Sequence, residues 1–71
     1  MSQHLGPASR RQLIRWLRDR GWDGPVSEAN HAHMIRGSRH VVLPTQSEIG
    51  SGLLLRILKQ AGYTRADWLS R

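Results

Sequence analysis

Three histidines, His31, His33 and His40, lie close together in the chain, and Arg36 and Arg39 lie among them. An imidazole exchanges protons near neutral pH, and a guanidinium donates two hydrogen bonds to one phosphate. These are the groups needed to cut RNA. A base removes a 2′-hydroxyl proton, an acid protonates the leaving oxygen, and cations stabilise the anionic transition state.

Alternation along residues 30–36 predicts a strand that carries two of these histidines. Ala32 and Met34 fall on one side of the strand, and His31 and His33 fall on the other. If the first pair faces the core, the two imidazoles stand side by side above solvent. We therefore expect His31 to project outward from the middle of a small sheet into a pocket of guanidinium groups.

A hairpin is predicted around this strand. Gly37-Ser38 is typical of a two-residue turn, and the β-prone run 41–43 ends at Pro44, because proline cannot donate to a ladder. A shorter strand is expected over residues 26–28. Two segments are expected to be irregular, the turn Asp23-Gly24-Pro25 and the loop from Thr45 to Gly50.

The first helix is predicted to begin after Ser9, because Ser9 and Gln12 have the spacing of a capping box, and Gly21 is a C-terminal stop. Its apolar positions share one face: Leu13, Trp16 and Leu17, with Ile14 at the edge. A cationic stripe lies opposite them: Arg11, Arg15 and Arg18. This stripe could bind RNA phosphates or an acidic partner, or could simply be solvated.

Two further helices are predicted after the hairpin. Ser51 is expected to cap the first of them and Gly62 to end it. The apolar face of this helix is Leu54, Ile57, Leu58 and Ala61. Thr64 and Asp67 repeat the capping-box spacing ahead of a short last helix, whose Trp68 is expected to dock on the core.

Composition limits the class of protein. A chain of 71 residues forms one domain, and its net charge of +6, with ten of eleven cations being arginine, favours a polyanionic partner. An arginine-rich proteome is the other explanation of the charge. Without cysteine there is neither a disulfide nor a thiolate site, and no apolar run is long enough to span a bilayer. No signal peptide is apparent at the start, so we expect a cytoplasmic protein and no membrane partner.

The expected architecture is α+β, in the order helix, three-stranded antiparallel sheet, helix and short C-terminal helix. Residues 1–8 are expected to be a flexible leader and residues 9–71 a single domain. The helices can cover only one face of so small a sheet, so the other face should meet solvent.

From Ser9 to Leu69 the sequence resembles the HicA family of toxins. Four segments carry the resemblance: Arg20-Gly21-Trp22, Asn30-His31, Val41-Val42-Leu43-Pro44, and Gly52 to Gly62, GLLLRILKQAG. The last is the most specific. It is similar to the family's Gly-x-Leu-x-x-Ile-Leu-x-x-Ala-Gly helix, which follows a Val-Val-Pro strand by a short loop in the family as it does here.

The resemblance implies a double-stranded-RNA-binding-domain-like fold, ribosome-independent mRNA cleavage with one essential histidine, and a HicB-like antitoxin that covers the site. Family members usually read Gly-Ser-His-His or Gly-Ser-Asn-His at that histidine. Gly37-Ser38-Arg39-His40 is similar to this motif, but placing the essential histidine at His40 leaves no strand between it and Pro44. Placing it at His31, in Asn30-His31, leaves room for a hairpin. The resemblance therefore points to His31. The chain departs from the family at Glu28-Ala29, which replaces Gly-Ser, and at Gln46, where a histidine is common.

The sequence thus predicts a metal-independent endoribonuclease toxin without a cofactor, whose partners are mRNA and a HicB-like antitoxin. His31 is the catalytic candidate, and the RNA-binding candidates are His33, Arg36, Arg39, Arg11, Arg15 and Arg18. Three alternatives remain open: a non-catalytic RNA-binding module of the same fold, a protein that binds an acidic partner, and zinc binding by the three clustered histidines.

Overall fold

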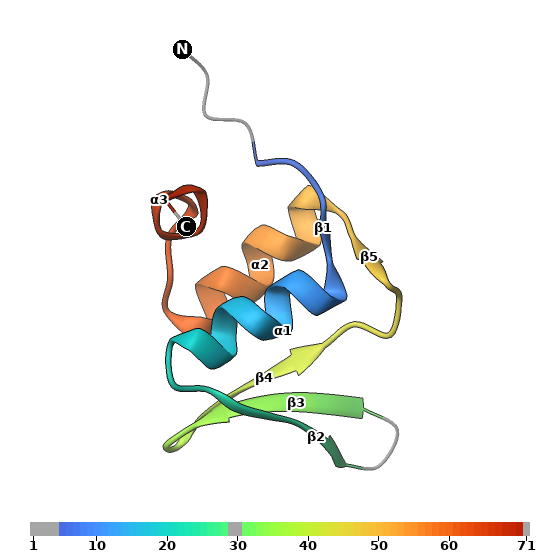
Figure 1. The fold of residues 1–71 in the computed structure, drawn as a ribbon, viewed down its shortest axis with the longest axis vertical. Helices are drawn as coiled ribbons and strands as arrows, with labels where there is room; N and C mark the ends of the chain where they lie inside the picture. The colour runs from blue at the N-terminus through green and yellow to red at the C-terminus, as the bar shows by residue number, and fades with distance from the viewer. Residues whose placement is uncertain (1–4, 29–30, 71) are drawn as a thin grey trace.

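Two helices lie across one face of a three-stranded sheet (Figure 1), as expected for an α+β, double-stranded-RNA-binding-domain-like fold. The computed structural model describes residues 5–28 and 31–70. Its elements are β1 (Ala8–Ser9), α1 (Arg10–Asp19), β2 (Asp23–Glu28), β3 (His31–Arg36), β4 (Arg39–Leu43), β5 (Glu48–Ile49), α2 (Ser51–Ala61) and α3 (Arg65–Leu69). No helix within these residues is long and apolar enough to cross a membrane.

The antiparallel sheet has the order β2-β3-β4, so the histidine strand is central as predicted. Met34 pairs with Val41, and both side chains are buried beneath the helices. Arg36 pairs with Arg39 across the predicted two-residue turn. Alternation then places the side chains of neighbouring positions on the opposite face, where Val26 and Val42 are 42% and 46% exposed. The predicted solvent-facing side of the sheet is therefore confirmed.

The expected turn at residues 23–25 is wrong, because β2 already begins at Asp23. Asp23 pairs with Ile35, and the register shifts before Val26 pairs with His33. Gly24 has a φ of +129°, and a Cβ atom there would lie 2.7 Å from the His33 carbonyl oxygen. Glycine thus lets the chain approach β3 closely, so that a bulge in the strand replaces a turn before it.

The predicted start of α1 is confirmed in detail. The Ser9 hydroxyl accepts a hydrogen bond from the Gln12 backbone N–H at 3.0 Å, and the Ser9 N–H donates to Gln12 Oε1 at 3.0 Å. After the helix Gly21 has a φ of +89°, which favours glycine and ends the helix. The buried face is the predicted one: Leu13, Trp16 and Leu17.

The cap predicted for α2 is wrong by one residue. Gly50 is the N-cap and makes no side-chain hydrogen bond, whereas Ser51 is the first helical residue. Gly62 adopts the left-handed conformation at the other end, and Thr64 caps α3 through the predicted capping box with Asp67. The predicted apolar face of α2 is buried: Leu54, Ile57, Leu58 and Ala61.

A second, two-stranded pairing joins the start of the chain to the segment before α2. Ala8, in the segment expected to be a leader, pairs with Ile49, in the segment expected to be a loop. Both side chains are buried. Leu5 is buried as well. Leu5 and Ala8 therefore belong to the core, whereas Pro7 between them is exposed. Residues 1–4 of the expected leader lie outside the described residues.

Aromatic side chains close the other end of the core. The Trp16 and Trp68 ring centroids lie 5.2 Å apart, and Trp16 meets Tyr63 edge-on at 4.8 Å. The Trp22 Nε1–H donates to the Tyr63 hydroxyl at 3.0 Å. Arg20 stacks on the Trp16 ring with its guanidinium carbon 3.7 Å from the ring centroid. The three tryptophans are thus core residues, which agrees with the predicted apolar position of Trp16 and the predicted docking of Trp68.

Candidate active site

His31 is the first residue of β3, the central strand, and its side chain is exposed. Ala32, the next residue, packs against the core, so alternation directs His31 to the open face of the sheet. The motif partner Asn30 and the neighbouring Ala29 lie outside the described residues. The position of His31 is thus the outcome of strand alternation, as the sequence predicts.

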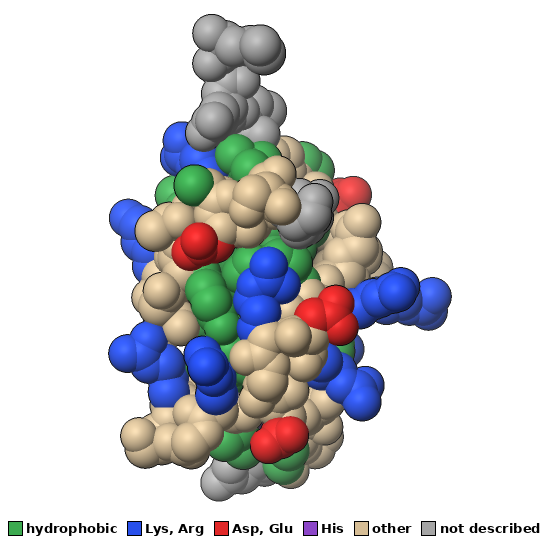
Figure 2. Space-filling model, turned by 60° about the vertical axis from the view of Figure 1, so that its left-hand side comes forward, with side chains coloured by type: hydrophobic (Ala, Val, Ile, Leu, Met, Phe, Trp, Pro, Cys, Tyr) green, Lys and Arg blue, Asp and Glu red, His purple; other side chains and the backbone are tan. Residues whose placement is uncertain are grey.

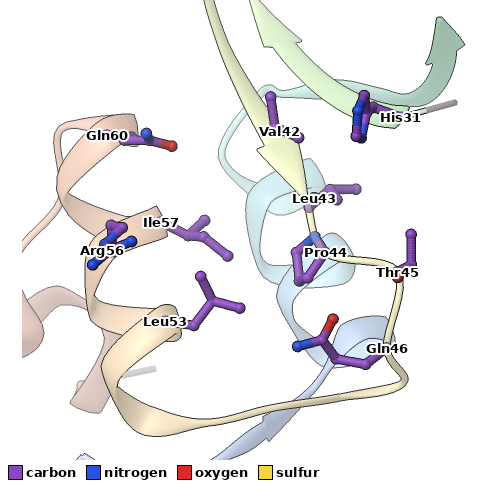
Figure 3. A pocket seen from close by; sticks show the side chains of 10 residues that line it. All are labelled: His31, Val42, Leu43, Pro44, Thr45, Gln46, Leu53, Arg56, Ile57 and Gln60. Atoms are coloured by element: carbon purple, nitrogen blue, oxygen red, sulfur yellow. The ribbon is translucent and has the colours of Figure 1, made fainter. Parts of the chain in front are cut away.

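A pocket of about 400 Å³ lies beside His31, at the edge of β4 (Figure 3). One side is formed by the end of β4 and the loop after it: Val42, Leu43, Pro44, Thr45 and Gln46. The facing side is α2, with Leu53, Arg56, Ile57 and Gln60. Figure 3 shows Leu53 and Ile57 extending from α2 toward the β4 side of the pocket.

The expected pocket of guanidinium groups around His31 is wrong, because Arg56 is the one arginine among the described residues that line the pocket. Sequence reasoning did not single out this residue. Its helical spacing with Leu53 and Gln60, at i, i+3 and i+7, was the available signal, since such spacing defines one face of a helix. That face flanks the buried face of α2 and meets the pocket.

The two hairpin arginines lie away from His31. Arg36 is five positions along the strand from His31, so it projects from the opposite face and lies about 17 Å away along the strand. The Arg36 Nε lies 3.8 Å from the position that a Cβ atom on Gly21 would occupy. The Arg39 guanidinium lies against the corresponding position on Gly62. Both guanidiniums therefore lie near the C-terminal ends of the two helices, where the helix dipole favours positive charge.

The arginine stripe of α1 forms a separate surface. Arg11, Arg15 and Arg18 are exposed and line a hollow of about 440 Å³ together with Ile14 and Asp19. This hollow has no lining residue in common with the pocket beside His31. Figure 2 shows Lys and Arg side chains spread over one face of the molecule, at its outline and across its middle, with Asp and Glu side chains among them.

The other two histidines of the cluster share the open face with His31. The His33 and His40 ring centroids lie 5.8 Å apart, and His33 Nδ1 is buried without a hydrogen-bond partner among the described residues. No group of three His, Cys, Asp or Glu side chains in residues 5–28 and 31–70 could hold a metal ion. The zinc alternative therefore has no cluster among the described residues to support it.

Arg10 holds the loop that borders the pocket. Its Nε donates to the Pro44 carbonyl oxygen at 3.0 Å, and its backbone N–H donates to the Ser47 carbonyl oxygen at 2.8 Å. These bonds connect the start of α1 to the loop on which Thr45 and Gln46 line the pocket. Sequence analysis missed this role, because no local pattern links residues so far apart in the chain.

This arrangement combines one accessible imidazole, one guanidinium and the polar side chains of Thr45, Gln46 and Gln60. The imidazole can exchange a proton, and the guanidinium can neutralise an anionic oxygen. The amide and hydroxyl groups can orient a bound phosphate or ribose by hydrogen bonds. The pocket is therefore suited to acid–base chemistry on a phosphodiester.

Comparison with known protein families gives a match over most of the chain. The model of the family described as the HicA toxin of bacterial toxin–antitoxin systems matches residues 10–63, which include His31, β4 and α2. No curated protein and no solved structure gives a significant match.

Proposed function

Since this chain belongs to the HicA family of toxins from bacterial toxin–antitoxin systems, we propose that it is an endoribonuclease that cleaves mRNA, with His31 as a general acid or base. The observation that carries the proposal is the position of His31, exposed on the central strand beside a pocket that also holds Arg56. The cleavage takes place in the cytoplasm and uses neither a metal ion nor a cofactor.

In the proposed reaction a base removes the proton of a ribose 2′-hydroxyl, and the resulting oxygen attacks the neighbouring phosphorus. The bond from phosphorus to the 5′ oxygen breaks, and an acid gives that oxygen a proton. His31 performs one of the two proton transfers. His33, which shares its face, or a water molecule performs the other. Arg56 stabilises the charge on the non-bridging oxygens.

Other cations extend RNA binding beyond the pocket. The exposed stripe of Arg11, Arg15 and Arg18 offers three guanidiniums to phosphates along the strand. Arg36 and Arg39 lie too far from His31 to touch the reacting phosphate, so they contact only a longer RNA. A HicB-like antitoxin neutralises the toxin by covering the pocket.

The test is the His31→Ala variant. We expect RNA cleavage by the purified protein to fall by about 10²- to 10⁴-fold, the usual contribution of acid–base catalysis, and growth arrest on expression to disappear. His40→Ala is the matched control, because it removes an imidazole from the same face but not from the pocket. Full cleavage by His31→Ala would refute the assignment.

A non-catalytic RNA-binding module is the second candidate. It is favoured by the separation of the α1 arginine stripe from the pocket beside His31. Such a module binds RNA equally well with or without the imidazole and leaves the RNA intact. RNA binding without cleavage by the wild-type protein, unchanged in His31→Ala, would support this second candidate over the first.

A further inference from the structure

One edge of the main sheet is regular and has no partner strand among residues 5–28 and 31–70. β4 is the last strand in the order β2-β3-β4, and none of the backbone hydrogen bonds outside helices and strands in the described residues involves Arg39 to Leu43. A strand edge of this kind presents N–H and C=O groups that can pair with another extended chain. The edge therefore offers a binding surface made of backbone.

The register identifies which residues present these groups. Arg36 and Arg39 flank a two-residue turn, so they form a pair whose backbone groups point at each other. Because hydrogen-bonded and non-hydrogen-bonded pairs alternate along an antiparallel ladder, His40 and Val42 direct their N–H and C=O groups away from β3. Both residues are exposed.

The other edge of the sheet does not offer such a surface. β2 contains Pro25, which has no N–H to donate, and its register shifts between Asp23 and Val26. Prolines and bulges are features that prevent further strands from pairing with an edge. Strand addition to this sheet is therefore directed to β4.

The pocket beside His31 lies along this open edge. It is bounded by Val42 and Leu43 on β4 and by Leu53, Ile57 and Arg56 on α2 (Figure 3). A groove between an edge strand and a helix accepts an extended peptide, whose backbone pairs with the strand while alternate side chains enter the groove. Ile57 and Leu43 are buried and supply an apolar floor, whereas Arg56 is exposed at the rim.

We propose that the antitoxin docks by adding an extended, acidic segment to the free edge of β4, filling the groove against α2 and blocking access to His31. This inference deepens the proposed function and rests on it, because it assumes that the antitoxin covers the site of cleavage. Apolar side chains of the segment contact Leu53 and Ile57. Its acidic side chains contact Arg56 and are attracted by the chain's net charge of +6.

Two other occupants fit the edge of β4 less well. RNA enters the pocket as the proposed substrate, but it has no backbone N–H and C=O groups to pair along β4. A second copy of this chain would bring two surfaces of net charge +6 together, with Arg39 at the edge of each. An acidic polypeptide matches both the backbone edge and the charge.

The experiment measures amide hydrogen exchange in the toxin carrying His31→Ala, which is not toxic to the host if the proposed function is right. The probe is the antitoxin protein encoded beside the toxin gene, purified and added in excess. We expect exchange at the His40 and Val42 amides to slow by about tenfold or more on binding, because they become hydrogen-bonded. Unchanged exchange at both amides in the complex overturns the proposal.

A pair of variants tests the same contact by affinity. Val42→Pro removes the N–H that points to the free edge, and the proline ring suits an edge strand. Val42→Thr keeps the N–H and the branched shape. We expect antitoxin affinity to fall by about tenfold or more in Val42→Pro and to change by less than about twofold in Val42→Thr. Equal affinities overturn the proposal, and the exchange measurement decides if Val42→Pro does not fold.

Two further arms identify the occupant. A single-stranded RNA that protects both the His40 and the Val42 amides as strongly as the antitoxin does, or a dimer of the free toxin in size-exclusion chromatography that protects them, would each overturn the proposal. Because every toxin variant used in these binding measurements also carries His31→Ala, the results do not depend on cleavage. A failure of the proposed ribonuclease activity is seen separately, in the RNA-cleavage assay of the wild-type chain.

Discussion

At the scale of single residues, the chemistry of the pocket depends on side chains from other segments that line it together with His31. Arg56 comes from α2, and the loop bearing Thr45 and Gln46 is held by Arg10 at the start of α1. Arg10 donates to two backbone carbonyl oxygens of this loop, those of Pro44 and Ser47. It acts on the site through the position of the loop, so it is a positioning residue.

Arg10→Gln tests this role. The variant loses the hydrogen bond from Arg10 Nε to the Pro44 carbonyl oxygen, so we expect the free energy of unfolding to fall by about 1 kcal/mol. RNA cleavage should also fall, because the loop bordering the pocket is less firmly held. Urea denaturation and the cleavage assay measure the two effects. Arg65→Gln, at the exposed start of α3, is the matched control for the loss of one charge.

If Arg10→Gln and Arg65→Gln have the same free energy of unfolding and the same cleavage rate, the bond to Pro44 does not position the loop. A fall in stability alone would assign Arg10 a structural role only.

At the scale of elements, α2 carries one wall of the pocket, so the signals at its two ends matter for the site. Gly50 precedes the helix without a side-chain cap, and Gly62 ends it in the left-handed conformation at a φ of +89°. Gly52, in the first turn, has nothing within 4 Å of the place where a Cβ atom would be. The conformation of Gly62 therefore favours glycine, whereas the position of Gly52 has room for a Cβ atom.

Gly62→Ala and Gly52→Ala test this contrast. Gly62→Ala should lower the free energy of unfolding by about 1 kcal/mol or more, because alanine is strained at positive φ and its Cβ atom meets the Arg39 side chain. Gly52→Ala should raise it by about 0.4–1 kcal/mol, because alanine restricts the unfolded chain without strain in the helix. Thermal and urea unfolding give both values, and shifts of the same sign would contradict the assignment.

At the scale of the whole molecule, the distribution of charge separates two surfaces. The α1 stripe carries three arginines, whereas the described lining of the groove beside His31 has one. A chain of net charge +6 attracts a polyanion over its whole surface, and the stripe supplies the local contacts. The proposed function therefore assigns the extended RNA contacts and the proton exchange to different parts of the surface.

Salt dependence of RNA affinity tests this separation. In the His31→Ala background the logarithm of the affinity for single-stranded RNA should fall linearly with the logarithm of the salt concentration, with a slope of about 0.7 for each phosphate contact. Arg15→Gln should reduce the slope by about 0.7. Lys59→Gln, an exposed charge on α2, is the matched control. Fluorescence anisotropy gives the slopes, and an equal change in both variants would argue against the stripe.

The sequence by itself determined the features that depend on neighbouring residues. The capping boxes at Ser9 and Thr64, the turn at Gly37-Ser38 and the exposure of His31 all follow from patterns a few residues long. The same alternation that exposes His31 places Arg36 on the opposite face, so the expected guanidinium pocket could have been rejected from spacing alone.

Only the tertiary structure decided which groups share the pocket with His31. Arg56 reaches the pocket because α2 packs beside β4, Arg10 holds the loop because β1 pairs with β5, and Gly24 lets β2 continue where a turn was expected. Each of these contacts joins segments far apart in the chain. Their geometry depends on how the helices pack on the sheet to bury apolar side chains. No local pattern of residues encodes that packing.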